Sequence, residues 1–241
     1  MSDLPKALSL AGSLAGSLAL SLDDYEGGAL RKITGPSLRP GGLALTKRVL
    51  DFCRFDRDAT LLDAGCGPGA TLELLSSLGF KPIGVETSKI FAEQASRFGV
   101  VHQSSISALP LSDDFCDGIF CECVLNLCDR RSALSEFFRV LKPGGFLAIS
   151  DVMLDGKDPS TNPRRCGCVD GAVSKDELFQ ELLNASFELS LMEDHKNELR
   201  SLAASLLWHY GPKGLEELTG GVGCRKNLTY ILVIAKKVAA L

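Results

Sequence analysis

A glycine-rich segment with the residue types of a ligand-binding loop follows a short apolar run at residues 59–64. Residues 61–69 read LLDAGCGPG, so the apolar run carries a carboxylate, Asp63, close to the loop. Glycine lets the backbone approach a ligand closely and permits positive φ. In an α/β sheet such a loop lies at the carboxyl ends of the strands, where ligands bind. The segment therefore predicts a binding site at that edge.

A second carboxylate follows the next apolar run. Glu86 ends the segment PIGVE, 23 residues after Asp63. An ionised carboxylate accepts hydrogen bonds, so Glu86 can hold both hydroxyls of a ribose. The loop and Glu86 together indicate a cofactor that contains a nucleoside.

Two other interpretations of the loop stay open at this point. Gly65, Gly67 and Ala70 satisfy the G-x-G-x-x-G/A pattern of nicotinamide-dinucleotide proteins, and Glu86 has a tolerable spacing. Asp63 argues against that cofactor, because a carboxylate repels a pyrophosphate and attracts the ammonium group of an amino acid. The loop can also be a tight turn without a ligand.

The chain has nine cysteines. An odd count in a chain large enough to bury its own core is untypical of a secreted disulfide framework, so we expect a reducing, cytoplasmic location. Cys121 and Cys123 are two apart on an expected strand, which predicts both thiols on one face. Cys166 and Cys168 form a second C-x-C pair. Four such thiols can form a zinc site, although the usual spacing is C-x2-C.

The elements that must position these groups alternate along the chain. Strands are expected at residues 59–64, 81–85, 100–101, 118–123 and 146–150, and helices at 43–55, 71–78, 91–97 and 131–141. This alternation predicts an α/β fold with a doubly wound, mostly parallel sheet. Two later strands, at 187–192 and 227–235, fit an edge of the same sheet, with helices at 175–184 and 198–210. Residues 33–42 are rich in turn residues and cannot form one regular element.

Length and composition limit the possible functions. The 241 residues correspond to one large domain or one domain with a cap, and 45% apolar and 23% charged residues exclude a wholly disordered chain. A net charge of −4 argues against nucleic acid as the main partner. No run of apolar residues is long enough to predict a membrane span. Serines interrupt the apolar residues 7–22, so we expect an extension there rather than a signal peptide.

Four segments, in order within residues 45–155, resemble the class I S-adenosylmethionine-dependent methyltransferases: LLDAGCGPG, PIGVE, ALPLSDDFCDGIF and RVLKPGGFLAISD. The resemblance implies a Rossmann-like sheet of seven strands with an antiparallel last strand, S-adenosylmethionine as cofactor, and methyl transfer. It divides the chain into an N-terminal extension and substrate cap, residues 1–44, and a methyltransferase domain, residues 45–241. The sulfonium is already activated, so the protein mainly aligns donor and acceptor, and no catalytic base is assigned.

The resemblance also implies roles for nine residues around the cofactor. Asp63, Gly65 and Gly67 would line its methionine part, with Cys66 in the same loop. Glu86 would hold the ribose, and Thr87, Ser105 and Ile106 would contact the adenine. Glu122 would lie near the methylsulfonium, together with its neighbours Cys121 and Cys123 at the end of the fourth strand. Many relatives have an aspartate where Ser105 stands, and a serine offers the adenine one hydroxyl.

Two further segments resemble arsenite methyltransferases. Residues 122–127, ECVLNL, are similar to their N-C-V-x-N-L stretch, and residues 168–172, CVDGA, to their C-x-G-G-A segment. In that family cysteines bind trivalent arsenic as thiolates, because arsenite is thiophilic. The resemblance implies Cys168 as an arsenic ligand and, by position, Cys224 as another. The family's cysteine-bearing N-terminal segment is replaced here by residues 34–42.

The expected acceptor is therefore a small molecule, arsenite or another thiophilic compound. Its site would include Cys166, Cys168 and Cys224. Arg39 is a further candidate, either as a grip for an anionic group or as a solvated loop residue. A nicotinamide-linked oxidoreductase and a non-catalytic, cysteine-rich protein that binds metal or metalloid remain as alternatives, and no resident metal is expected.

Overall fold

A computed structural model describes residues 29–155, 171–218 and 228–238. The expectation for residues 7–22 lies outside these ranges, and the division at residue 44 stays a prediction. Within the described residues, none of the helices combines the length and the apolar character that a membrane span requires.

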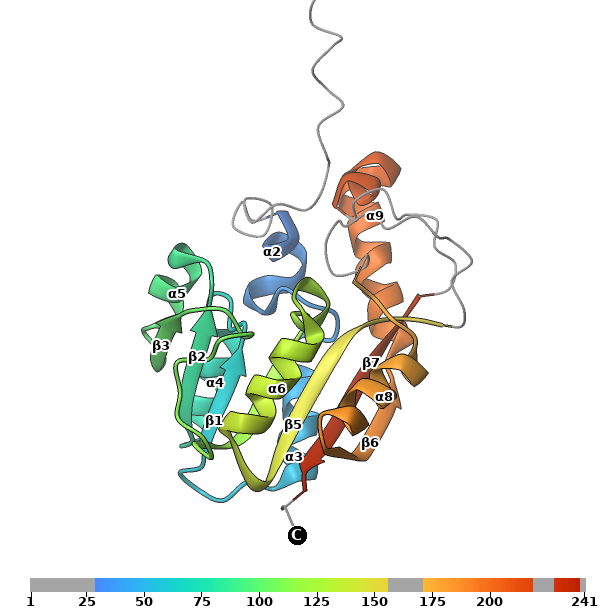
Figure 1. Ribbon diagram of the computed structural model, residues 1–241. Coiled ribbons are helices and arrows are strands. Elements are labelled where there is room, and N and C mark those ends of the chain that lie inside the picture. The colour runs from blue at the N-terminus through green and yellow to red at the C-terminus, as the bar shows by residue number, and fades with distance from the viewer. Residues whose placement is uncertain (1–28, 156–170, 219–227, 239–241) are drawn as a thin grey trace, which may run out of the picture.

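In the described residues seven strands form one sheet, in the order β3-β2-β1-β4-β5-β7-β6 (Figure 1). Their bounds are β1 Thr60–Ala64, β2 Lys81–Glu86, β3 Val100–Gln103, β4 Cys116–Glu122, β5 Leu141–Leu154, β6 Phe187–Asp194 and β7 Leu228–Lys237. Strands β1 to β5 pair in parallel, whereas β7 is antiparallel to both β5 and β6. The Rossmann-like sheet with an antiparallel last strand is confirmed.

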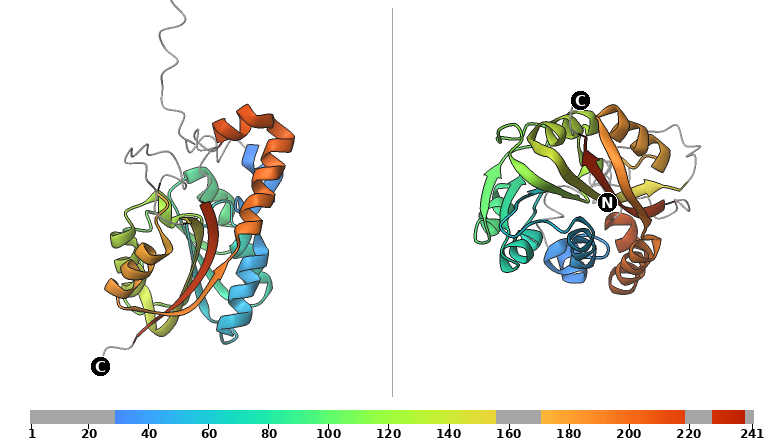
Figure 2. Two further views of the ribbon diagram at one scale, coloured as in Figure 1. Left: turned by 90° about the vertical axis from the view of Figure 1, so that its right-hand side faces the viewer. Right: turned by 90° about the horizontal axis from the view of Figure 1, so that it is seen from below.

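Helices cover both faces of the sheet (Figure 2). Helices α6, Arg130–Val140, and α8, Lys175–Asn184, pack on one face through the largest apolar cluster of the molecule. The opposite face carries α3, Leu43–Cys53, α4, Ala70–Ser77, α5, Lys89–Ala95, and α9, Lys196–Leu218. Strands that are covered on both sides read as nearly continuous apolar runs, as in the fully buried Leu61 and Leu62 of β1.

The strand order reverses between β1 and β4, because β2 lies on one side of β1 and β4 on the other. At such a switch point two loops leave the sheet in opposite directions and open a crevice at the carboxyl ends of the strands. Helix α2, Ala29–Thr34, and the 3-10 turn η1, Gly35–Ser37, lie above these strand ends, between α5 and α9 (Figure 1). Arg31 Nη1 donates a hydrogen bond to Gln94 Oε1 of α5 at 3.1 Å. Residues 33–42 therefore do not form one regular element, as expected.

Two elements run further than the sequence pattern predicts. Strand β5 begins at Leu141, which pairs with Cys116, and it contains the Pro143-Gly144-Gly145 stretch as an irregularity in the ladder. The expected fifth strand, 146–150, was therefore too short. Helix α9 extends past residue 210 to Leu218 across a kink, because Gly211 takes a φ of 69° and Pro212 starts the next turn.

The glycines that flank α4 provide a stability test of the loop geometry. Gly69 and Gly79 both have left-handed φ values, 97° and 89°, but a Cβ on Gly69 would lie 2.9 Å from the Ala95 Cα, whereas Gly79 has open space. Gly79→Ala should cost about 1 kcal/mol through the left-handed backbone alone. Gly69→Ala should cost roughly 2 kcal/mol more, because the backbone of α5 would have to move. Urea unfolding of both variants checks this, and equal losses would contradict it.

Candidate active site

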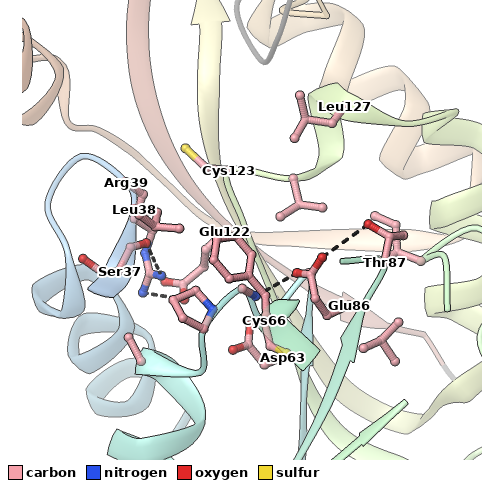
Figure 3. Close-up of a pocket in the computed structure, with 18 of the residues that line it drawn as sticks. Ser37, Leu38, Arg39, Asp63, Cys66, Glu86, Thr87, Glu122, Cys123 and Leu127 are labelled. Atoms are coloured by element: carbon pink, nitrogen blue, oxygen red, sulfur yellow. Dashed lines mark hydrogen bonds and ion pairs between the residues drawn. The ribbon is translucent and has the colours of Figure 1, made fainter. Parts of the chain in front are cut away.

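A cavity of about 390 Å³ opens at the carboxyl ends of β1, β2 and β4 (Figure 3). Its walls come from the segment 36–39, the loop after β1, the end of β2, residues 104–106 and the end of β4. All nine residues that the sequence assigns to the cofactor line this one cavity, and Arg39 lines it too. The predicted set is thus brought together in space, and the individual roles stay predictions.

Glu86 joins the end of β2 to the glycine loop. Its Oε2 accepts a hydrogen bond from the Gly67 N–H at 2.9 Å, and its Oε1 accepts one from the Ser88 N–H at 2.8 Å. The Thr87 hydroxyl lies 3.3 Å from Oε1. Oε1 accepts from both Ser88 and Thr87, whereas Oε2 keeps a second lone pair for a ligand hydroxyl. The backbone thus fixes the orientation of the carboxylate and leaves acceptor capacity at Oε2.

The glycine loop is shaped by close packing. The Gly65 N–H donates to the Val85 carbonyl at 2.8 Å, which anchors the loop beside β2. Gly65 has a φ of 82°, and a Cβ there would lie 2.5 Å from a methyl group of Val124. Only glycine satisfies both conditions. Cys66 packs beneath β2, with its Sγ 2.7 Å from where a Cβ on Gly84 would stand, and burial raises the pKa of its thiol.

Asp63 is a buried carboxylate in a crowded electrostatic environment. Its side chain is only 3% exposed, and among the described residues we find no hydrogen bond to its carboxylate. Burial raises its pKa well above the usual range, the charge of Glu122 adds to the shift, and Arg39 opposes it. A bound cationic group beside Asp63 would therefore stabilise the charged form of its carboxyl group, which burial disfavours.

Arg39 and Glu122 form a buried ion pair beside Asp63 (Figure 3). Arg39 Nη2 lies 2.7 Å from Glu122 Oε2, and both side chains are less than a tenth exposed. The hydroxyls of Thr46 in α3 and Thr71 in α4 each accept a hydrogen bond from Arg39 and donate one to Glu122. This cluster connects the segment above the cavity to β4, α3 and α4.

The structure excludes the interpretation of Arg39 as a solvated loop residue, because its side chain is buried. Burial opposes its charge, but Glu122 and the neighbouring acidic groups more than compensate, and the pKa of Arg39 is raised. Within the described residues, two buried side-chain polar atoms have no hydrogen-bond partner, Arg39 Nε and Asn126 Oδ1. The guanidinium thus carries one buried N–H without a partner in the described part of the chain.

The prediction that Cys121 and Cys123 share one face is wrong. Strand β4 ends at Glu122, and Cys123 takes a left-handed φ of 61°, which breaks the alternation. Cys121 is fully buried in the core, whereas Cys123 lines the cavity. Its Sγ lies 3.4 Å from the Tyr230 Oη. Among the described residues no group of three or more His, Cys, Asp or Glu side chains is arranged for a metal ion, and Cys166, Cys168 and Cys224 lie outside them.

Sequence reasoning missed several residues of the site. Cys128, to which the sequence analysis assigns no role, lines the cavity, and its thiol donates to the Leu125 carbonyl at 3.3 Å. Burial raises the pKa of this thiol to about 11. Tyr230 was missed because it lies within the apolar strand β7, where no spacing distinguishes it from core residues.

The two segments that resemble arsenite methyltransferases meet in the structure. Gly171 packs against the backbone carbonyl of Asn126 so closely that a Cβ would overlap it. Arg130 Nη1 donates to the Gly171 carbonyl at 2.8 Å. Asp151 holds Asn126 from below, by accepting hydrogen bonds from its backbone N–H and its side-chain amide at 3.1 and 3.0 Å. Burial raises the pKa of Asp151 to about 7, although backbone N–H groups oppose the shift.

Comparison with known proteins decides the family. A family model described as a methyltransferase domain matches residues 62–149. The O-methyltransferase resE of Aspergillus sclerotiorum is 30% identical over 202 residues, 74% of this chain and 75% of that protein. The chain belongs to the class I S-adenosylmethionine-dependent methyltransferases. It is an enzyme, and S-adenosylmethionine is its methyl donor. This membership decides against the nicotinamide-dinucleotide alternative.

Other matches cover smaller parts of the methyltransferase sequence. The uncharacterized methyltransferase YodH of Bacillus subtilis is 36% identical over 115 residues, and the matched segment spans only 49% of that protein and 45% of this chain. An arsenite methyltransferase of Halobacterium salinarum is 36% identical over 88 residues, 34% of this chain and 22% of that protein. The fold is shared with the geranyl diphosphate C-methyltransferase of Streptomyces coelicolor, with a TM-score of 0.70, 16% identity, and coverage of 82% of this chain and 76% of that one.

The cavity of this methyltransferase fits the chemistry of the donor. Asp63 is a buried carboxylate suited to the methionine ammonium, and Glu86 is an oriented carboxylate suited to the ribose hydroxyls. The close packing at Gly65 keeps the floor of the loop free of side chains. Three carboxylates and one guanidinium leave the cavity with net negative charge, which complements a donor whose sulfonium makes it cationic.

Asp63→Asn separates stability from donor binding. The pKa of Asp63 is raised in the folded protein, so its contribution to stability is present at low pH and is lost as the pH rises through the raised value. The ligand-free variant should therefore unfold at a temperature no lower than the parent's at pH 8. Its affinity for S-adenosylhomocysteine should fall about tenfold or more, because the ammonium loses its charged partner.

Thermal unfolding and titration calorimetry measure these two quantities for Asp63→Asn. Asp58→Asn is the control, because Asp58 forms an exposed pair with Lys81 away from the cavity. A variant that loses stability and keeps its affinity would contradict the assigned role.

The Arg39–Glu122 pair can be compared with a half-exposed pair in the same molecule. Arg39→Met should cost about 3 kcal/mol or more, because it leaves the Glu122 charge buried without its partner. Arg48→Met removes the pair with Glu193, whose side chains are 39% and 28% exposed, and should cost less than about 1 kcal/mol. Chemical denaturation measures both, and a cost at Arg39 no larger than at Arg48 would show that the buried pair does not stabilise the cap.

Proposed function

We propose that this enzyme, a methyltransferase of small molecules, methylates a thiophilic acceptor, arsenite or a compound like it, at the end of the cavity beside β4. The observation that supports this most is the packing of Gly171 on Asn126. It joins the two short segments that the sequence analysis compared with arsenite methyltransferases, although they are far apart in the sequence.

This contact relates the second segment to the cavity. Asn126 belongs to the 3-10 turn η2, Leu125–Leu127, and its neighbours Val124 and Leu127 line the cavity wall. Cys168 belongs to the same resembling segment as Gly171 and lies outside the described residues. We therefore keep Cys168, with Cys166 and Cys224, as proposed acceptor ligands.

The residues of the cavity have distinct proposed roles. S-adenosylmethionine supplies a methyl group activated on a sulfonium. Asp63 and Glu86 hold its ammonium and ribose, and Thr87, Ser105 and Ile106 border its adenine. Segment 36–39, fastened by Arg39, covers the cavity and keeps water away from the reacting atoms.

Thiols can bind arsenite without a catalytic base. Each cysteine that binds arsenous acid replaces one hydroxyl, and the thiol proton leaves with that hydroxyl as water. Arsenic and sulfur keep their oxidation states. A thiol whose pKa is raised, as at Cys128, therefore does not need prior ionisation to be a ligand.

Oxygen methylation is a second candidate, because the relative resE, an O-methyltransferase, matches 74% of this chain. A hydroxyl acceptor needs a group that takes its proton. Glu122, the carboxylate at the end of β4, is held by Arg39. An acceptor that arrives already ionised, such as a carboxylate, therefore fits this site better than a neutral alcohol.

A methyl-transfer screen with labelled donor tests the proposed function. The acceptors are arsenite, small thiols, and aliphatic and aromatic carboxylates. We expect methylated arsenic from the parent, and a loss of about tenfold or more in Cys168→Ser, because one arsenic–thiolate bond cannot form. Cys53→Ser is the matched control, because Cys53 lies outside the donor cavity at the opposite edge of the sheet.

No turnover of arsenite in this screen would remove the thiophilic acceptor, and turnover of a carboxylate in its place would support the second candidate. Arsenite activity that survives Cys168→Ser unchanged would remove that cysteine as a ligand.

A further inference from the structure

The chain turns sharply into the donor cavity at Cys123. This residue has a φ of 61°, a left-handed conformation that non-glycine residues seldom adopt and that costs about 1 kcal/mol or more. The turn separates Cys123 from the core face that Cys121 occupies and brings it to the edge of the cavity, which it lines (Figure 3). The fold thus holds a strained residue at the acceptor end of the site.

A buried hydroxyl group supports this sulfur from the far side. Tyr230 of β7 is fully buried, and its Oη lies 3.4 Å from Cys123 Sγ and 3.1 Å from Ser150 Oγ, to which it donates a hydrogen bond. Ser150 lies in β5 and is itself fully buried. The position of the tyrosine hydroxyl is therefore fixed by the sheet and not by solvent.

Arg39, which lines the cavity together with Cys123, has an N–H group without a hydrogen-bond partner in the described residues. Arg39 lines the cavity with Cys123, interacts electrostatically with both Cys123 and Tyr230, and is 7% exposed. Its Nε has no hydrogen-bond partner in the described part of the chain. A thiol and a buried cation therefore lie on one wall of the cavity.

The other described thiols are occupied elsewhere. Cys121 lies in the core, Cys66 packs beneath β2, and the Cys128 thiol is bonded to the Leu125 carbonyl. Among the described cysteines, Cys123 therefore has the geometry for contact with an acceptor.

We infer that Cys123 is a thiol ligand of the methyl acceptor and that Tyr230 is the positioning residue that holds it there. The inference rests on the proposed function and adds to it a ligand that lies within the described residues.

The chemistry balances with arsenous acid. The Cys123 sulfur forms a bond to arsenic, one arsenic–hydroxyl bond breaks, and the thiol proton leaves with that hydroxyl as water. Before the bond forms, the Tyr230 hydroxyl can accept from the thiol while it donates to Ser150 Oγ. After the bond forms, its single proton can turn from Ser150 Oγ to the sulfur, and the Ser150 hydroxyl can then donate to the tyrosine oxygen.

Alkylation mapping tests the ligand directly. The full-length protein is treated with N-ethylmaleimide at increasing concentrations of arsenite, with and without S-adenosylhomocysteine, and each cysteine is quantified by peptide mass spectrometry. We expect arsenite to protect Cys123 and to leave Cys53 unprotected. Equal alkylation of Cys123 with and without arsenite would overturn the inference.

Tyr230→Phe tests the positioning role. The arsenite concentration that half-protects Cys123 should rise up to about tenfold, because one hydrogen bond to the sulfur is lost. The KM for arsenite should rise in parallel, while the affinity for S-adenosylhomocysteine changes less than about twofold. A purely structural role would instead weaken both ligands together. Ser150→Ala, which removes the second anchor of the hydroxyl, should give a smaller shift in the same direction.

The outcomes separate this inference from the proposed function. A parent protein that does not methylate arsenite would refute the thiophilic acceptor, whatever happens at Cys123. A parent that methylates arsenite, together with Cys123→Ala and Cys123→Ser variants that fold and keep its KM, would refute the inference alone. Calorimetry with S-adenosylhomocysteine confirms that each variant retains a folded donor site.

Discussion

The site depends on how three carboxylates and one guanidinium are paired at the carboxyl ends of the strands. Three carboxylates, Asp63, Glu86 and Glu122, meet at the carboxyl ends of adjacent strands, and one guanidinium, Arg39, lies among them. Carboxylates taken out of water repel one another and oppose folding unless they are paired. Arg39 pairs with Glu122, backbone N–H groups satisfy Glu86, and Asp63 is left with a strongly raised pKa. Burial of Asp63 is thus unfavourable in the protein alone and is offset where the methyl donor brings a positive charge.

The same ion pair ties together parts of the chain that otherwise have little contact. Arg39 comes from the segment above the cavity, Glu122 from β4, and the two threonines between them from α3 and α4. A mixed network of this kind is strong only while all its members are present. Closure of the cavity roof and the shape of its floor are thus parts of one cluster, which links donor binding to the order of residues 36–39.

The part of the structure around Cys123 and Asn126 is held by backbone contacts rather than by paired charges. There the chain uses tight backbone contacts, such as Gly171 on Asn126, and a left-handed residue at Cys123. Strain and close approach are stable only where the surrounding packing over-determines the conformation. Asp151 and Arg130 supply that support from β5 and α6. The result is a rigid wall on which side chains from four elements face the cavity.

Local pattern alone identified the alternation of strands and helices, the glycine loop, and the carboxylates Asp63 and Glu86, because each is a matter of periodicity or spacing within a short segment. The family resemblance, in turn, implied nine residues that line one cavity. Local pattern failed where the answer depends on partners distant in the chain. The burial of Arg39 depends on its pairing with Glu122. The separation of Cys121 from Cys123 depends on a left-handed turn at the end of β4. Tyr230 comes close to Cys123 only because β7 pairs with β5. Sequence thus determines which elements form and which chemistry a loop can support. The tertiary structure decides which charges are paired and which cysteines line the cavity, because burial and contact between remote segments exist only once the sheet is assembled.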